Sequence, residues 1–121
     1  MNIETAIRIA TAAHDGQLDK GGQPYILHAM RVMMNVDATD EKIVAVLHDV
    51  LEDTDVTPDD LVREGIKPRQ LAALHAITKR EGERYADYLL RVTDNPIALR
   101  VKIADVEDNM DLTRLNYVSK A

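Results

Sequence analysis

Two pairs of adjacent polar residues, His48-Asp49 and Glu52-Asp53, lie one helical turn apart and carry groups that bind metal ions or move protons. At about 100° per residue, all four fall on one side of a helix that we predict over 40–52, opposite an arc of Val, Ile and Leu. Acidic side chains at the carboxyl end of a helix oppose its macrodipole, and a nearby cation would reverse that penalty. The alternative is a solvated acidic helix end, which is common for a pair of acids.

Two further polar residues, His28 and Asp105, stand in otherwise apolar sequence. His28 follows Tyr-Ile-Leu, and taken alone it is more often an ordinary histidine than a ligand. Asp105 is flanked by Ile, Ala and Val, and burial of an unpaired carboxylate there would be costly. A metal ion held by His28, His48, Asp49 and Asp105 would compensate this charge. Two imidazoles and two carboxylates suit manganese, iron, zinc or another divalent ion.

Helices must position these residues, because apolar residues recur at three- and four-residue spacing and no segment alternates as a strand does. We predict helices over about 2–14, 26–35, 40–52, 57–65, 68–78, 83–92 and 95–115. Thr57-Pro58 and Asn95-Pro96 are typical helix starts, with a capping side chain before a proline at the first helical position. Residues 15–24 contain three glycines and a proline, so we expect a loop there.

The composition supports an all-α fold. The chain of 121 residues fits one domain, which we expect to span 1–121. Phe and Trp are absent and only four Tyr occur, so the core must consist of aliphatic side chains, which pack readily from amphipathic helices. We expect His14 and His75 to be ordinary core or surface histidines.

The charge and the cysteine count exclude several function classes. With 15 Lys+Arg against 21 Asp+Glu, the net charge is −6, which argues against nonspecific binding of nucleic acid or anionic membrane. Without cysteine there is no disulfide, thiolate zinc site or cysteine nucleophile. No apolar run approaches the roughly 18 residues of a membrane span, and the N-terminus lacks the pattern of a secretory signal. We therefore expect a cytoplasmic enzyme or binding module.

Three segments together resemble the HD-domain metal-dependent phosphohydrolases, in particular the hydrolase domain of the RelA/SpoT alarmone enzymes and their small single-domain relatives. They are AHDGQLDKGGQPYILHAMRV from Ala13, AVLHDVLEDTDVT from Ala45 and VKIADVEDNMDLTRL from Val101, in the family's order and over nearly the whole chain. The resemblance implies an all-α fold, one divalent ion, usually manganese (Mn²⁺), and removal of the 3′-pyrophosphate from (p)ppGpp. The implied metal ligands are His28, His48, Asp49 and Asp105.

The resemblance also implies roles for residues around the metal. Glu52 and Asp53 match the family's catalytic acidic pair, which positions or deprotonates the attacking water. We expect four residues to bind the small-molecule nucleotide substrate: Lys20, Tyr25, Lys102 and Asn109. Where the family usually has consecutive basic residues, this chain has Asp19 before Lys20. Longer relatives continue with further helices, so we expect part of the substrate wall to be missing or to come from another subunit.

Two other functions stay open from the sequence. The first is an HD phosphohydrolase that acts on another nucleotide or phosphate ester, for which Asp19 is the reason. The second is a nucleotide or metal sensor without turnover, against which the Glu52-Asp53 pair argues, because a sensor needs no base. The sequence leaves the metal's identity and the oligomeric state undetermined.

Overall fold

The computed structural model describes residues 1–111, and within this range the regular structure is helical. Its helices are α1 (Ile3–Ala13), α2 (Ile26–Met34), α3 (Thr39–Leu47), α4 (Val50–Asp53), α5 (Pro58–Arg63), α6 (Pro68–Ile77), α7 (Tyr85–Thr93) and α8 (Pro96–Asn109). A single β-bridge, between Leu18 and Pro24, is the only extended pairing among these residues. The prediction of an all-α fold is therefore confirmed. None of the described helices is long and apolar enough to cross a membrane.

The helix starts follow the capping residues of the sequence. Asn2 Oδ1 accepts the Thr5 N–H at 2.8 Å at the start of α1, and Asn95 Oδ1 accepts the Ala98 N–H at 3.0 Å at the start of α8. Thr57 caps α5 through the Asp60 N–H at 3.1 Å. These side chains satisfy N–H groups that have no partner inside the helix. The predicted starts at Thr57-Pro58 and Asn95-Pro96 are thus confirmed.

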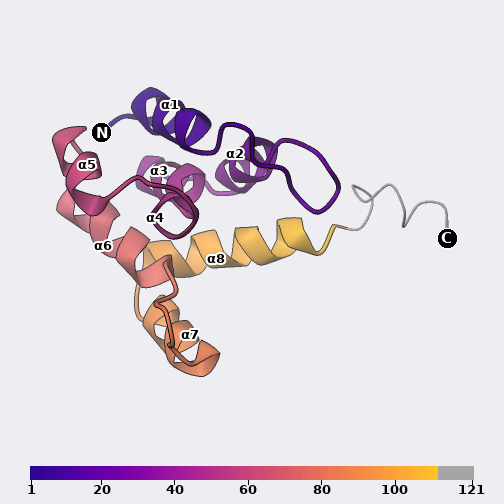
Figure 1. The fold of residues 1–121 in the computed structure, drawn as a ribbon. Helices are drawn as coiled ribbons and strands as arrows, with labels where there is room; N and C mark the ends of the chain where they lie inside the picture. The colour runs from indigo at the N-terminus through magenta and orange to yellow at the C-terminus, as the bar shows by residue number, and fades with distance from the viewer. Residues whose placement is uncertain (112–121) are drawn as a thin grey trace, which may run out of the picture.

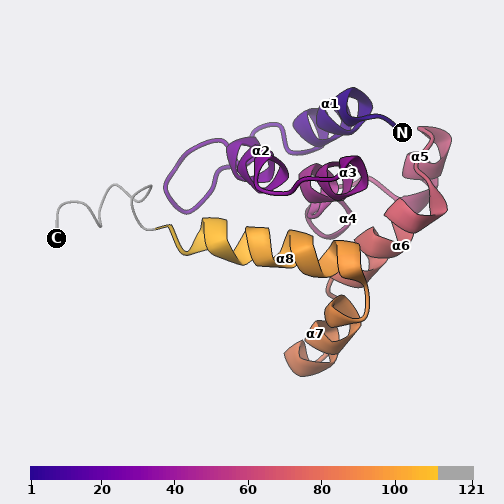
Figure 2. The same cartoon turned by 180° about the vertical axis from the view of Figure 1, so that it is seen from behind.

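Helix α3 is the centre of the structure. It packs against α1, α2, α6 and α8, and Figures 1 and 2 show α8 running beside α2 and α3 while α7 projects away from them. The largest apolar side chains that are fully buried are Ile43, Leu47, Leu61, Leu74, Val32, Val44, Val46, Val50, Val92 and Val101. Five consecutive residues of α3, 43–47, are all inaccessible to solvent, so the C-terminal part of this helix is enclosed on every side. It can therefore hold functional groups rigidly where it ends.

The helix predicted over 40–52 is interrupted, which corrects the sequence-based prediction. It divides into α3 and α4, and Asp49 lies between them with φ −108° and ψ 1°. The cause is a side chain that takes a place in the helical hydrogen-bond ladder, because His48 Nδ1 donates to the Ala45 carbonyl at 2.6 Å. In a continuous helix that carbonyl would accept the Asp49 N–H. The interruption changes the direction in which Asp49 and the residues after it point.

The last helix is shorter than predicted. Helix α8 ends at Asn109 rather than near residue 115, and residues 112–115 of that prediction lie outside the described range. Its last turn contains Glu107 and Asp108 and no basic residue, so its charges oppose the helix macrodipole. The Asp111 N–H donates to the Asp108 carbonyl at 3.2 Å in a tight turn after the helix.

Candidate metal and phosphohydrolase site

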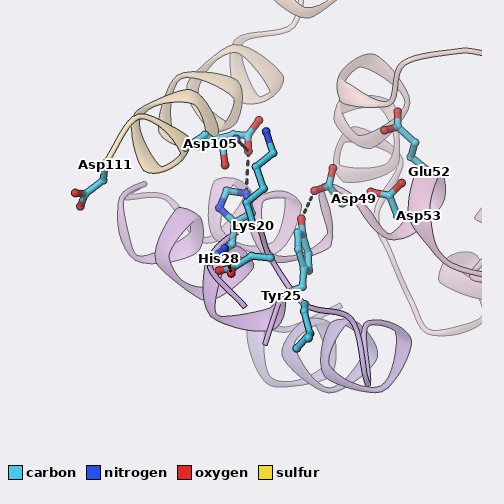
Figure 3. Close-up of a pocket in the computed structure, with 12 residues that line it drawn as sticks. Lys20, Tyr25, His28, Asp49, Glu52, Asp53, Asp105 and Asp111 are labelled. Carbon is cyan, nitrogen blue, oxygen red and sulfur yellow. Dashed lines mark hydrogen bonds and ion pairs between the residues drawn. The ribbon is translucent and has the colours of Figure 1, made fainter. Parts of the chain in front are cut away.

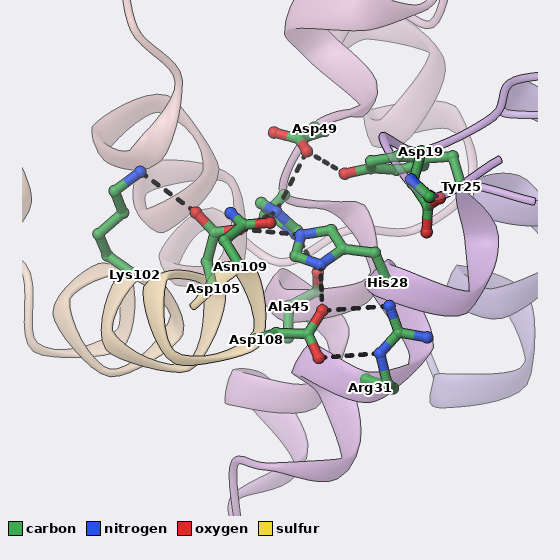
Figure 4. A network of polar contacts seen from close by, with 12 residues as sticks. Asp19, Tyr25, His28, Arg31, Ala45, Asp49, Lys102, Asp105, Asp108 and Asn109 are labelled. Carbon is green, nitrogen blue, oxygen red and sulfur yellow. Dashed lines mark hydrogen bonds and ion pairs between the residues drawn. The ribbon is translucent and has the colours of Figure 1, made fainter. Parts of the chain in front are cut away.

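The four predicted metal ligands meet where α2, the turn between α3 and α4, and α8 come together. Figure 4 shows His28, Asp49 and Asp105 at this junction. His28, His48 and Asp49 each offer a ligand atom within 4.8 Å of the others. Asp105 Oδ1 adjoins both imidazoles, at 2.9 Å from His28 Nε2 and 3.3 Å from His48 Nε2. The structure thus brings together two imidazoles and two carboxylates from segments far apart in the sequence. A group of this kind can hold a divalent metal ion.

His48 is the most informative member of the cluster, because its surroundings demand a cation. It is 3% exposed, and its Nδ1–H donates to the Ala45 carbonyl, so Nε2 faces the cluster. Nε2 lies 3.2 Å from Asp49 Oδ2 and 3.3 Å from Asp105 Oδ1, yet no described group meets it in hydrogen-bond geometry. Burial lowers the pKa of His48, but the two carboxylates outweigh burial and raise that pKa to about 10. Either a proton or a metal ion must therefore occupy the space between Nε2 and the carboxylates.

Asp105 is a buried carboxylate that stays charged. It is 7% exposed, and burial alone would raise its pKa, but the contact with His28 Nε2 and the neighbouring His48 imidazole hold that pKa far below its usual range. Lys102 Nζ lies 3.2 Å from Asp105 Oδ2, and Asn109 Nδ2 donates to Asp105 Oδ1 at 3.3 Å. Two of the predicted substrate residues, Lys102 and Asn109, therefore contact a candidate ligand directly.

Behind His28 lies a second carboxylate that the sequence analysis missed. His28 Nδ1 donates to Asp108 Oδ2 at 2.6 Å, and Arg31 Nε donates to Asp108 Oδ1 at 2.8 Å. Burial raises the pKa of Asp108, which is 6% exposed, but hydrogen bonds from Arg31 and His28 outweigh burial and lower it. A carboxylate on the far nitrogen of a ligating histidine fixes its tautomer and its orientation. The signal in the sequence was a second acidic residue three positions after Asp105, on the same face of α8.

Tyr25 and His14 form the wall beside Asp49. The Tyr25 hydroxyl donates to Asp49 Oδ2, and burial together with the negative charge of Asp49 raises the pKa of Tyr25. The predicted substrate residue Tyr25 therefore contacts a candidate metal ligand. His14 is 2% exposed, and its ring lies 4.5 Å from the Tyr25 ring. Its Nδ1 pairs with Gln17 Oε1 at 2.8 Å, but its Nε2 has no partner among the described residues. His14 is therefore a buried histidine beside the site with one ring nitrogen unpaired among residues 1–111, and His75 is exposed on α6, which agrees with the expectation of core or surface histidines.

The acidic pair lies at the mouth of the cluster, as Figure 3 shows. Oxygen atoms of Asp49, Glu52 and Asp53 lie within 4.8 Å of one another. Partial burial and the neighbouring carboxylates raise the pKa values of both Glu52 and Asp53. A carboxylate with a raised pKa accepts a proton more readily at neutral pH. The structure thus places two basic carboxylates beside the candidate metal ligands.

A cavity of about 370 Å³ opens at this mouth and contains the predicted substrate residues Lys20, Tyr25 and Asn109 in its wall. The loop over 15–24 forms one side of the cavity. Asp19 belongs to the framework of this loop, because its Oδ1 accepts the Gly21 N–H at 2.9 Å and the Gln23 N–H at 3.0 Å. Lys20, by contrast, is exposed at the rim of the cavity.

Lys102, the fourth predicted substrate residue, lies on another side of the cluster. It lines a smaller cavity of about 190 Å³ together with Lys79, Tyr85 and Tyr88. In Figure 4 it approaches Asp105 from the side opposite Asp19 and Tyr25. The two cavities share Asp49, Glu52 and Asp105. The predicted substrate residues are therefore divided between two cavities that adjoin one cluster of candidate ligands.

Known proteins resemble this chain in sequence. The chain is 29% identical over 120 residues to the guanosine-3′,5′-bis(diphosphate) 3′-pyrophosphohydrolase of Aquifex aeolicus, a match that covers 89% of this chain and 17% of that protein. It is 30% identical over 137 residues to the protein of the same name from Borreliella burgdorferi, covering 98% of this chain and 20% of that protein. The chain thus spans about a fifth of the length of these curated relatives. No protein-family model matches it.

A solved structure resembles the fold. It comes from work on a metazoan SpoT ortholog that hydrolyses ppGpp, and it superposes with a TM-score of 0.77 at 22% identity, covering 91% of this chain and 68% of the other. This likeness establishes the helical fold. Together with the sequence matches, it confirms the resemblance to the RelA/SpoT hydrolases.

Proposed function

We propose that this chain is a metal-dependent phosphohydrolase that removes the 3′-pyrophosphate from (p)ppGpp, with Mn²⁺ as its ion. The observation that supports this proposal most strongly is His48 Nε2, which has no hydrogen-bond partner among the described residues. It is buried between the carboxylates of Asp49 and Asp105 and requires a cation there. The names of the relatives from Aquifex aeolicus and Borreliella burgdorferi supply the reaction and the substrate. We further propose that the chain acts in the cytoplasm, on this small-molecule nucleotide.

His28 and His48 would hold the ion through their Nε2 atoms, and Asp49 and Asp105 through carboxylate oxygens. A divalent ion in such a site neutralises charge on phosphoryl oxygens and lowers the pKa of water. Asp108 and the Ala45 carbonyl keep the two imidazoles in the tautomer that this role needs, because each accepts the proton of an Nδ1 atom. The donor set favours Mn²⁺ or a similar divalent ion because it combines imidazole nitrogen with carboxylate oxygen.

Glu52 and Asp53 would supply the base. As the oxygen of water forms a bond to the phosphorus next to the ribose, one of the two carboxylates accepts its proton. The bond between that phosphorus and the ribose 3′ oxygen breaks, and the 3′ oxygen leaves with the electron pair and takes up a proton. The products are pyrophosphate and a nucleoside with its 5′ phosphates intact. Positioning and charge stabilisation account for most of the rate enhancement in phosphoryl transfer.

The test is a turnover screen of ppGpp and other nucleotides with added Mn²⁺, in which chromatography identifies each product. The proposal predicts GDP and pyrophosphate in equal amounts from ppGpp. Release of orthophosphate from ppGpp would assign a different reaction, and turnover confined to other nucleotides would assign a different substrate. Binding of ppGpp without turnover would favour a sensor.

A further inference from the structure

We infer that the smaller cavity, lined by Lys79, Tyr85, Tyr88 and Lys102, is a subsite for the distal phosphate of a diphosphate group whose other phosphate lies at the metal cluster. The inference rests on the proposed function and deepens it, because it says where the two phosphates of the scissile group lie. It also makes this cavity the element that distinguishes a diphosphate from a monophosphate.

The two cavities differ in charge. The larger cavity has Asp19, Asp53 and Asp111 in its wall besides the shared acids, and Lys20 is its one cation among the described residues. The smaller cavity contains two cations, Lys79 and Lys102, and no acid other than those it shares with the larger one. A phosphate group with two negative charges is therefore better accommodated in the smaller cavity.

Lys102 is held in place for such a contact. Its ammonium lies 3.2 Å from Asp105 Oδ2 and 5.5 Å from the centre of the Tyr88 ring. The Tyr88 ring is itself fixed, because the Tyr88 hydroxyl donates to the Ile77 carbonyl at 2.6 Å. A fixed ammonium between a candidate metal ligand and the cavity can contact a phosphate without reorganising.

Lys79 differs from Lys102 because its ammonium is not paired with a carboxylate among the described residues, so its charge is available to a ligand. It follows α6 directly after Thr78, and no carboxylate among residues 1–111 lies within ion-pair distance of its ammonium. Tyr85 lines the same cavity and carries a hydroxyl, which is a hydrogen-bonding group. The ammonium of Lys79 and the hydroxyl of Tyr85 are donors of a kind suited to the terminal oxygens of a phosphate.

The smaller cavity lies where it can hold one phosphate of a diphosphate group while the other phosphate lies at the metal cluster. Asp49, Glu52 and Asp105 separate the two cavities, so a phosphate at these residues faces both. The second phosphate can then enter the smaller cavity while the nucleoside occupies the larger one beside Lys20 and Asn109. At about 190 Å³ the smaller cavity has room for a phosphate but not for a nucleoside as well.

The test measures binding without turnover. Equilibrium dialysis of the full chain at a fixed free Mn²⁺ concentration compares radiolabelled pyrophosphate with radiolabelled orthophosphate. The parent should prefer pyrophosphate, and Lys79→Met should reduce that preference about tenfold by removing one charge-assisted hydrogen bond. Lys79→Arg should restore most of the preference. Arg80→Gln is the matched control, because Arg80 is the neighbouring exposed cation and does not line this cavity.

The ratio of the two affinities separates a subsite from a general loss of structure, because misfolding would weaken both anions alike. Loss of the preference in Lys79→Met, together with its retention in Arg80→Gln, supports the inference. A parent without preference for pyrophosphate, or a Lys79→Met variant that keeps the parent's preference, overturns it. Failure of the proposed function shows elsewhere, as the absence of pyrophosphate release from ppGpp in the turnover screen.

Discussion

Replacing Asp108 by asparagine separates the charge behind His28 from the geometry behind it. The new amide oxygen can still accept the His28 Nδ1–H, so the imidazole keeps its tautomer. The negative charge that now lies 2.6 Å from Nδ1 and 2.8 Å from Arg31 Nε is lost. Because Asp108 is only 6% exposed, water screens this charge weakly. His28 then becomes a poorer electron donor to a metal ion.

The expected loss of Mn²⁺ affinity follows from the usual effect of a carboxylate that is hydrogen-bonded to a ligating histidine. Removing one weakens metal binding by about 10- to 100-fold, which corresponds to about 1.4–2.7 kcal/mol. We therefore expect Asp108→Asn to bind Mn²⁺ with a Kd raised by that factor. Glu107→Gln is the matched control, because Glu107 is the preceding acidic residue of α8 and is exposed. Its Kd should equal that of the parent.

The assay is a chelator competition for Mn²⁺ at fixed pH, with the thermal unfolding of each metal-free variant measured alongside. Nitrogen-15 NMR of the imidazoles reports whether His28 keeps its proton on Nδ1. If Asp108→Asn retains both this tautomer and the parent's Kd, then Asp108 does not tune the metal site, and the reasoning is refuted.

Other predictions follow from the same site. Glu52→Gln combined with Asp53→Asn should leave the Mn²⁺ Kd nearly unchanged while turnover falls by roughly 10²-fold or more, and a double variant with parental turnover would place the base elsewhere. Mn²⁺ binding at pH 7.5 should release about one proton. His48, whose pKa is raised to about 10, must lose its proton to become a ligand. Calorimetry in buffers of different ionisation enthalpy measures the number of protons released. The pKa of His48 in the folded protein lies above its ordinary value of 6.5. Protonated His48 should therefore stabilise the metal-free protein fully below pH 6.5, and this stabilisation should be lost as the pH rises towards 10. Thermal melts of the metal-free protein across this pH range measure the loss. Lys20→Ala should raise the KM for ppGpp several-fold, less so at high salt. Asp19→Arg should raise the KM as well, although it adds a cation, because Asp19 holds the loop together; a lowered KM would show that local charge outweighs loop geometry.

The helices were accessible from sequence because they depend on local spacing, whereas the polar cluster was indicated by polar residues in apolar sequence and by the family resemblance. Apolar periodicity and the caps at Thr57 and Asn95 locate most helices to within a few residues. The interruption at His48 was not accessible in this way, because it depends on a side chain that competes with the backbone for the Ala45 carbonyl. Periodicity describes which face a residue occupies and cannot register such a competition.

The features of the site that the sequence did not predict depend on contacts between distant segments. Asp108 meets His28 across 80 residues of sequence, where α2 and α8 pack together. The spacing of Asp105 and Asp108 places both on one face of α8 but does not indicate that Asp108 pairs with His28. His14 adjoins the site only because the loop after α1 turns Tyr25 back onto it. The division of Lys20 and Lys102 between two cavities likewise depends on how α8 lies relative to the loop.

The central claim is that the cation required beside His48 is a catalytic metal ion. Its most direct test is the initial rate of pyrophosphate release from ppGpp by the parent and by His48→Ala, each with Mn²⁺ and after chelation. The parent should release pyrophosphate only with Mn²⁺, and His48→Ala should stay at background under both conditions. Parental rates from His48→Ala, or from the chelated parent, would contradict the claim.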